Sequence, residues 1–250
     1  ALAAIFQQDP LILISKASSG IASPYDLQGK RIMFDTSGGN DAVFLAMFTD
    51  AGLSPSDYQH VTQDQKLDRL LNDDVDVMSI YRTDQLFQLS QLGVAVNILN
   101  PQSYGFDFYG DILFTADSEI RHHPGRAERF RRASLKGWRY ALENPDEIID
   151  LIIHQYNAQA SREQLQHEAR EIQKLIMADL IPVGQLDVAR LRHSAQVYAR
   201  LNIAPTLSES QLEGFIYQSN ANLRLTPDEQ SWLENHPVIR LGIDADFAPY

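Results

Sequence analysis

The first half of the chain alternates short apolar runs with short amphipathic patterns, and this alternation constrains the fold more than any other feature. Strand-like runs fall at 11–15, 31–35, 75–80, 94–99 and 111–115. Between them, Val43, Met47 and Ala51 recur at helical spacing before Gly52, and shorter helical patterns cover 65–71 and 84–92. Short strand–helix units in this rhythm predict an α/β fold with a mostly parallel sheet flanked by helices.

From residue 124 onward the pattern becomes helical. Helices are predicted over 124–142, from Asn144-Pro145 onward, from the Ser161/Gln164 capping pattern to about 177, and over 187–201 and 208–217. The polar segment 219–225 has the character of a linker. A new helix start at Thr226-Pro227 and a strand over 238–244 then predict the beginning of a second domain over 226–250. Because the chain opens at Ala1 within an apolar run, we expect it to be a piece of a longer protein.

Composition excludes several classes of function. The 250 residues carry 21 Lys and Arg against 33 Asp and Glu, a formal net charge of −12, which argues against nucleic acid as the main partner. Cysteine is absent, and this excludes disulfides, thiol nucleophiles, zinc ribbons and iron–sulfur ligation, and is compatible with an oxidising compartment. No stretch has the length and apolarity of a membrane span.

The usual catalytic signatures are also missing, so we expect no enzyme activity and no cofactor. The sequence has no nucleophile elbow, no zinc-protease motif, no phosphate-binding P-loop and no dinucleotide fingerprint. His122-His123 is the only adjacent histidine pair, and without further ligands at suitable spacing it predicts an exposed loop rather than a metal site. The basic residues along 124–142 predict a solvated helix face, with a docking surface as the alternative.

Two strand-to-helix turns are candidate ligand-binding segments. Ser37, Gly38, Gly39 and Asn40 follow a predicted strand and open a helix, where free backbone amides favour an anion or a polar ligand; an ordinary tight turn is the alternative. In the second turn, Tyr81 offers a ring for stacking on a flat ligand. Asp84 is either a ligand contact or simply the N-cap of the next helix.

A third candidate combines aromatic residues, carboxylates and glycines within eight positions. The segment 104–111 holds Tyr104, Asp107, Tyr109 and Asp111 just before a predicted strand. Aromatic residues at this density usually belong to a core. Because glycines and aspartates make a buried segment without regular structure unfavourable, we favour the lining of a binding cleft.

Several segments resemble one protein family. The segment Ser23-Pro24-Tyr25-Asp26-Leu27-Gln28-Gly29-Lys30-Arg31-Ile32 resembles a motif of the type II periplasmic substrate-binding proteins. The segments 3–10, 104–115 and 134–142 are similar to the branch that binds or makes the pyrimidine precursor of thiamine, and the resemblance covers about residues 1–218. The tail 225–244 is similar to the opening of an amino-acid-type Venus-flytrap domain, as found in bacterial membrane sensors.

The resemblance implies a type II periplasmic-binding-protein fold with two lobes and a hinge, the first lobe being incomplete at the N-terminus. Lobe II would span about 20–103, and lobe I would combine 1–15 with 105–218. The segments 6–13 and 104–110 would form the hinge. Residues 37–40 would offer polar groups to the ligand, Tyr81 and Tyr109 would sandwich a ring, and Asp84, Asp107 or Asp111 would accept from its amino group.

The implied function is capture of a thiamine-pyrimidine-like heterocycle in the periplasm. Hinge closure would signal to an output domain of the same membrane-anchored chain. One alternative is the substrate-binding protein of an ABC transporter, whose partner would be a permease. The other is a synthase of the pyrimidine precursor, as in eukaryotic relatives, whose key lysine and histidine would precede Ala1.

Overall fold

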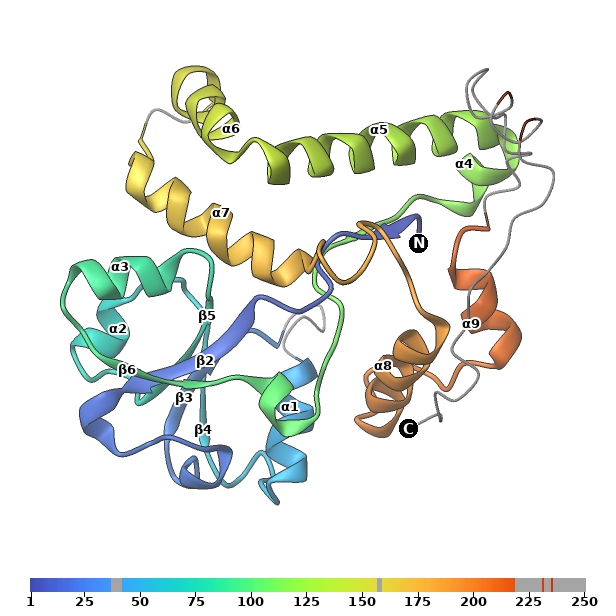
Figure 1. The fold of residues 1–250 in the computed structure, drawn as a ribbon. Coiled ribbons are helices and arrows are strands. Elements are labelled where there is room, and N and C mark those ends of the chain that lie inside the picture. The colour runs from blue at the N-terminus through green and yellow to red at the C-terminus, as the bar shows by residue number, and fades with distance from the viewer. Residues whose placement is uncertain (37–41, 157–158, 219–230, 232–234, 236–250) are drawn as a thin grey trace, which may run out of the picture. The chain divides into compact units, whose positions relative to one another are not determined.

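The computed structural model describes residues 1–36, 42–156, 159–218, 231 and 235 (Figure 1). The chain divides into two compact units, Ala1–Tyr217 and Gln218–Tyr250. The predicted linker 219–225, the predicted strand 238–244 and nearly all of the predicted tail helix lie outside the described residues.

A five-stranded sheet forms one half of this unit, with the strand order β4-β3-β5-β2-β6. The strands are β2 (Leu11–Lys16), β3 (Arg31–Phe34), β4 (Gln59–Thr62), β5 (Val77–Tyr81) and β6 (Val96–Leu99). β3 runs parallel to β4 and β5, whereas β2 runs antiparallel to both β5 and β6. The prediction of a mostly parallel sheet is thus wrong for the inner strand β2. This strand enters the sheet directly from residues 5–10 and not through a helical crossover, so it need not run parallel to its neighbours.

Both faces of this sheet are buried, as the alternation along its strands shows. Leu13 and Phe34 belong to the cluster on one face, together with the apolar side of α1 (Ala42–Asp50). Ile12, Ile14 and Met33 belong to the cluster on the other face, with α2 (Asp68–Leu71) and α3 (Gln85–Gln91). This two-sided burial explains why the sequence shows continuous apolar runs instead of strict alternation.

The other half of the unit is mostly helical. β1 (Ala3–Ala4) pairs antiparallel with β7 (Ile112–Leu113), and α5 (Pro124–Glu143), α6 (Pro145–Leu151) and α7 (Arg162–Ile176) lie together above them (Figure 1). Residues of β1, α5 and α7 share one apolar cluster, which includes Ile5, Leu135 and Leu175. A π-helical turn, Ile152–Tyr156, extends α6. We call α5, α6 and α7 the helical layer.

The structure also corrects the sequence analysis at smaller elements. His122 ends a short helix, α4 (Asp117–His122), so the histidine pair does not lie in a plain loop. Asn144 occupies the predicted cap position of α6, but its side chain makes no capping hydrogen bond and donates to the Tyr140 carbonyl instead. Ser161 does accept from the backbone of Gln164, as the predicted cap of α7 requires.

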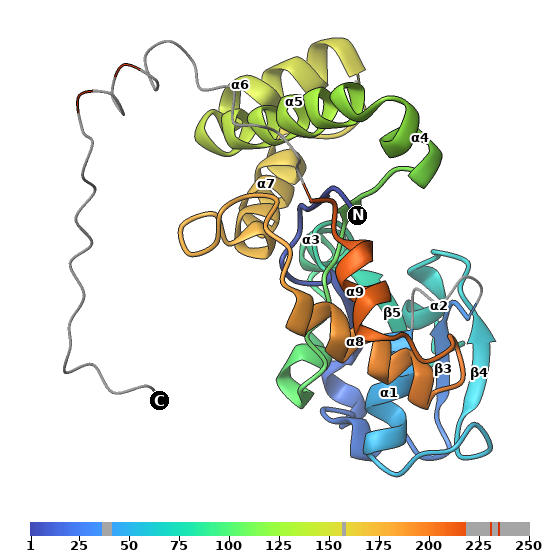
Figure 2. The same cartoon turned by 90° about the vertical axis from the view of Figure 1, so that its right-hand side faces the viewer.

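The last two helices return to the five-stranded half. α8 (Val188–Arg200) lies beside α1, and α9 (Glu209–Phe215) follows it (Figure 2). Val197 of α8 belongs to the same buried cluster as Phe44 and Met47 of α1. The C-terminal part of the unit therefore packs against the sheet half, although we assigned all of 105–218 to the first lobe.

Two segments, 5–10 and 104–111, connect the halves and run side by side. The amide of Ile5 donates to the carbonyl of Asp111 at 2.8 Å, and the amide of Gly110 donates to the carbonyl of Phe6 at 3.1 Å. A Cβ at Gly110 would lie 2.8 Å from the Gln8 carbonyl oxygen, so only glycine fits this approach. We call these two stretches the crossing segments. Because β2 begins at Leu11 within the five-stranded sheet, that half starts earlier than the predicted boundary near residue 20.

Candidate ligand site

The carboxyl end of β5 brings two predicted site residues next to the helical layer. Tyr81 ends the strand with 42% of its surface exposed, and its backbone amide donates to Gln85. Asp84 occupies the N-cap position of α3, yet its carboxylate makes no capping bond. It accepts instead from Gln88 at 2.9 Å and from Gln164 of α7 at 3.2 Å, which joins the two halves.

An ion pair makes a second link to α7, from the turn that follows β5. Arg82 contacts the carboxylate of Glu171 at 2.8 Å, and Lys174 contacts the other oxygen of that carboxylate. Only 10% of the Glu171 side chain is exposed. Burial acts to raise the pKa of Glu171, but Lys174 and Arg82 outweigh it and lower the pKa, so the carboxylate is held ionised.

A third link between α3 and α7 lies one turn of α7 before Glu171. The rings of Phe87 on α3 and His167 on α7 are 5.4 Å apart between centroids. Burial raises the pKa of the neighbouring Glu168, a bond from Gln164 opposes this rise, and the charge of Asp84 adds to it. Three contacts in succession thus form a continuous junction between α3 and α7, next to the exposed ring of Tyr81.

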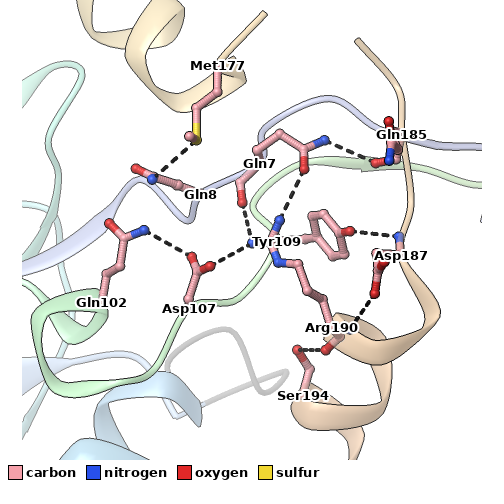
Figure 3. A network of polar contacts seen from close by, with 10 residues as sticks. All are labelled: Gln7, Gln8, Gln102, Asp107, Tyr109, Met177, Gln185, Asp187, Arg190 and Ser194. Atoms are coloured by element: carbon pink, nitrogen blue, oxygen red, sulfur yellow. Dashed lines mark hydrogen bonds and ion pairs between the residues drawn. The ribbon is translucent and has the colours of Figure 1, made fainter. Parts of the chain in front are cut away.

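A separate polar network ties α8 to the crossing segments, centred on Arg190 (Figure 3). The Arg190 guanidinium donates to the side-chain oxygen of Gln7 at 3.1 Å, to the backbone carbonyl of Gln7 at 2.6 Å and to the Asp107 carboxylate at 3.1 Å. It also lies 4.1 Å from the centroid of the Tyr109 ring. Gln7 is 2% exposed and completes its bonding by donating to the Gln185 carbonyl. This network fixes the crossing segments relative to α8.

The aromatic and acidic segment 104–111 is therefore largely engaged within the fold. Tyr109 is buried, and its hydroxyl accepts from the amide of Asp187, the N-cap of α8. Asp107 is bonded by Gln102 as well as by Arg190, and Tyr104 is half-buried against the core of the sheet half. Asp111 as a whole residue is exposed, but neighbouring groups partly shield its carboxyl from water, and this raises the pKa of Asp111.

The first predicted segment, Ser37 to Asn40, lies outside the described residues. Its ends are placed, since β3 finishes at Phe34 and α1 begins at Ala42. The segment thus connects the carboxyl end of β3 to a helix, and β3 is the neighbour of β5 in the sheet. Strand ends of parallel neighbours share one sheet edge, so β3 and β5 both end at the edge where Tyr81 lies.

Sequence reasoning did not assign roles to Arg82, Glu171, Arg190 or Gln7. One signal was present for Glu171, because it falls on the α7 face that carries Leu165 and Leu175, where a carboxylate needs a partner. Arg82, its partner, is 89 positions away in the sequence. Pairings at such a distance need the fold to be known first.

Within the described residues, no group of three or more histidine, aspartate or glutamate side chains is arranged to hold a metal ion. In the same part of the chain, no helix combines the length and the apolar character that a bilayer crossing requires.

One curated relative is similar over part of the chain. A stretch of 150 residues is 29% identical to the riboflavin-binding protein RibY of Chloroflexus aurantiacus. The stretch is 59% of this chain and 42% of the relative, so the chain spans about two fifths of the length of that relative.

Solved structures show the fold. The chain is similar to the periplasmic aliphatic sulphonate binding protein SsuA from Escherichia coli, with a TM-score of 0.60 and 13% identity over 98% of this chain and 75% of that chain. It is also similar to the desulfurization enzyme DSZB, with a TM-score of 0.54 and 14% identity over 84% and 75% of the two chains. The chain thus has the α/β fold of the periplasmic binding proteins, as expected.

The family follows from a match that includes the crossing segments, β5 and the Tyr81 turn. Residues 1–148 match the family model described as NMT1/THI5 like, which is more than half of the chain. On this match, the chain belongs to the NMT1/THI5-like family.

Proposed function

We propose that this chain is the ligand-binding part of an extracytoplasmic binding protein that captures a small planar heterocycle between two lobes. The five-stranded sheet with α1, α2 and α3 is lobe II, and the helical layer with β1 and β7 is lobe I. The observation that carries the proposal is the junction of α3 and α7 beside the exposed Tyr81 ring, at the strand-end edge where α/β sheets bind ligands.

The crossing segments fit the role of a hinge in this proposal. They join β1 to β2 and β6 to β7, so both connect the two lobes covalently, and Arg190 holds both of them against α8. A ligand drives closure only through contacts that exist in the closed form. The Arg82–Glu171 pair and the Asp84–Gln164 bond join the lobes directly, so they add to the stability of a closed form around the ligand.

The proposed ligand is aromatic because of two supporting observations. Tyr81 presents a ring at the strand end, and the similar protein RibY is named for riboflavin, which is itself a planar heterocycle. The resemblance to the thiamine-precursor branch points to an aminopyrimidine. Tyr81 would stack on the ring, the amides of 37–40 would meet its polar edge, and Asp84 would accept from an amino group.

The contacts of Tyr104, Asp107, Tyr109 and Asp111 favour a different use of that segment. One face of the Tyr109 ring is occupied by Arg190, and the Asp107 carboxylate pairs with the same guanidinium, whereas both partners of Asp84 are neutral amides. We therefore propose that these residues position the hinge, while Tyr81 and Asp84 contact the ligand.

Two settings are proposed for this capture step. In the first, the chain is the periplasmic sensor part of a membrane-anchored protein, with residues 226–250 beginning a second binding domain that leads to an output domain. In the second, the chain belongs to the substrate-binding protein of an ABC transporter, which the likeness to the sulphonate-binding protein favours. The gene distinguishes them, because output domains encoded after Tyr250 indicate a sensor and a neighbouring permease gene indicates transport. In either setting the protein acts by binding and not by catalysis.

Calorimetric titration of the intact protein tests the ligand class. The panel is hydroxymethylpyrimidine, riboflavin and an aliphatic sulphonate. We expect a heterocycle to bind and Tyr81→Ala to weaken its binding about fivefold, since a lost aromatic stack removes on the order of 1 kcal/mol. Tyr25→Ala is the matched control, because Tyr25 is 69% exposed and belongs to the turn Pro24–Asp26 before β3. Binding of the sulphonate alone, or equal effects of the two variants, would contradict the proposal.

A further inference from the structure

A second cavity lies beside the crossing segments, on the side of α8 and α9. Its volume is about 320 Å³. Among the described residues that line it, none belongs to β5, α3 or α7. The lining is mostly apolar and comes from the second crossing segment, from α8 and from the chain around α9. It includes Phe108, Tyr109, Leu191, Ala195, Tyr198 and Leu212. The cavity is therefore separate from the proposed interlobe site.

Asp9 is the one charged side chain among the described residues that line this cavity. One of its carboxylate oxygens accepts from the amide of Leu11 at 2.9 Å. Its other oxygen has no hydrogen-bond donor among the described residues. A carboxylate with a free oxygen in apolar surroundings is costly to ionise, and burial raises the pKa of Asp9 to about 6, against the bond from Leu11.

Aromatic rings surround the space beside this carboxylate. Phe108 and Tyr198 are stacked with 5.8 Å between their ring centroids, and both line the cavity. Tyr109 lines it as well, and its ring already attracts the Arg190 cation at 4.1 Å. Aromatic faces together with a carboxylate are the groups that recognise an ammonium ion. From this arrangement we propose that the cavity binds a small organic cation, an ammonium group on an apolar body of about one ring.

Charge and size both support this choice of ligand. The titratable groups facing Asp9 are Asp111 and Tyr198, and the His193 ring lies 6.5 Å from the Phe108 ring between centroids. Asp111 adds negative charge, and the nearby Arg190 cation is already paired with Asp107, so an anion beside Asp9 would be repelled. The volume is at the lower end for small-molecule pockets, which suits a one-ring amine.

The probe for this proposal is 2-phenylethylamine, with 2-phenylethanol as its neutral counterpart of equal shape. Binding to the intact protein is followed by calorimetry at pH 8 and pH 5. We expect the amine to bind and the alcohol to bind at least tenfold more weakly at pH 8. Affinity for the amine should fall about tenfold at pH 5, where Asp9 is mostly protonated and the amine stays charged.

Two variants and a control complete the test. Asp9→Asn should remove the preference for the amine, and Ala195→Leu should fill the cavity and reduce binding of both probes. Asp179→Asn, at an exposed position after α7, should change neither.

Equal binding of amine and alcohol, or no binding of the amine at millimolar concentration, would overturn the proposal. Displacement of the amine by the heterocycle of the interlobe site would also overturn it, because the two would then share one site. If no heterocycle binds, the proposed function fails, while the cavity is still tested by the two probes.

Discussion

Replacing Arg190 tests whether one side chain holds the crossing segments in place. The substitution Arg190→Met keeps most of the apolar stem and removes the guanidinium. It deletes the bonds to the side chain and the backbone carbonyl of Gln7, the pairing with Asp107, and the contact with the Tyr109 ring.

The expected loss of unfolding free energy is about 3 kcal/mol, and most of it comes from Gln7. Since Gln7 is 2% exposed, two of its oxygens would lose their donor, at about 1–2 kcal/mol each after partial relaxation. The Asp107 side chain is 44% exposed, so its pairing contributes below about 1 kcal/mol. The contact with the Tyr109 ring adds on the order of 0.5–1 kcal/mol.

Urea unfolding of the intact protein, monitored by circular dichroism, measures this loss. Arg192→Met is the matched control on the same helix. Arg192 pairs with Glu209 at 2.6 Å on the surface, so its loss should change the unfolding free energy little. If the two variants unfold at the same urea concentration, the network around Arg190 does not hold the crossing segments, and the reasoning fails.

Three further predictions concern the junction of α3 and α7, the carboxyl of Asp9, and the close approach of Gly110 to Gln8 between the crossing segments. Glu171→Gln removes the charge opposite Arg82 and should weaken ligand binding about fivefold by calorimetry. Glu163→Gln, on the exposed face of α7, should leave the affinity unchanged. Equal affinities of the two variants would exclude a role for the junction in closure. The raised pKa of Asp9 means that the folded state favours the protonated form, so Asp9 stabilises fully below about pH 4 and loses this contribution as the pH rises through about 6. Asp9→Asn should therefore become more stable relative to the parent protein by up to about 2–3 kcal/mol between pH 4 and pH 7 in denaturant melts, and a difference that does not change with pH would disprove the assignment. Gly110→Ala should lower the unfolding free energy by about 1–3 kcal/mol, because its Cβ would meet the Gln8 carbonyl at 2.8 Å. Gly137→Ala in the interior of α5, where no atom lies close to the added Cβ, should stabilise the protein by on the order of 0.5–1 kcal/mol. Thermal melts that rank the two variants the other way would contradict the close approach at Gly110.

The sequence predicted most elements of the fold because their patterns are local. Strands β2, β3, β5 and β6 and helices α5, α7 and α8 appear where apolar periodicity and capping residues place them. The edge strand β4 was missed because Gln59–Thr62 is mostly polar and exposed, so it lacks the apolar signal of its neighbours. The antiparallel direction of β2 was also missed, because strand direction depends on the path between strands and not on composition.

The candidate site was predicted less well, for a related reason. Tyr81 does end a strand at the expected sheet edge, but the partners of Asp84 and Arg82 lie on α7, 80 and 89 positions later. Tyr109 was expected to face a ligand, yet the structure gives it Arg190 and Asp187 as partners, which no local pattern indicates. Residue types identified the segment as unusual, while its use depends on contacts distant in the sequence.

The central claim is that ligand capture moves the two lobes together, and a distance between spin labels measures this directly. Because the 250 residues include no cysteine, Ser90→Cys on α3 and Glu163→Cys on α7 would be the only labelled positions among them. Both positions are exposed, and they lie on the two helices that form the junction. The account predicts that the bound heterocycle shortens and narrows the distribution of distances between the labels in pulsed electron spin resonance. A distribution that stays the same when calorimetry shows the ligand to be bound would contradict capture by closure.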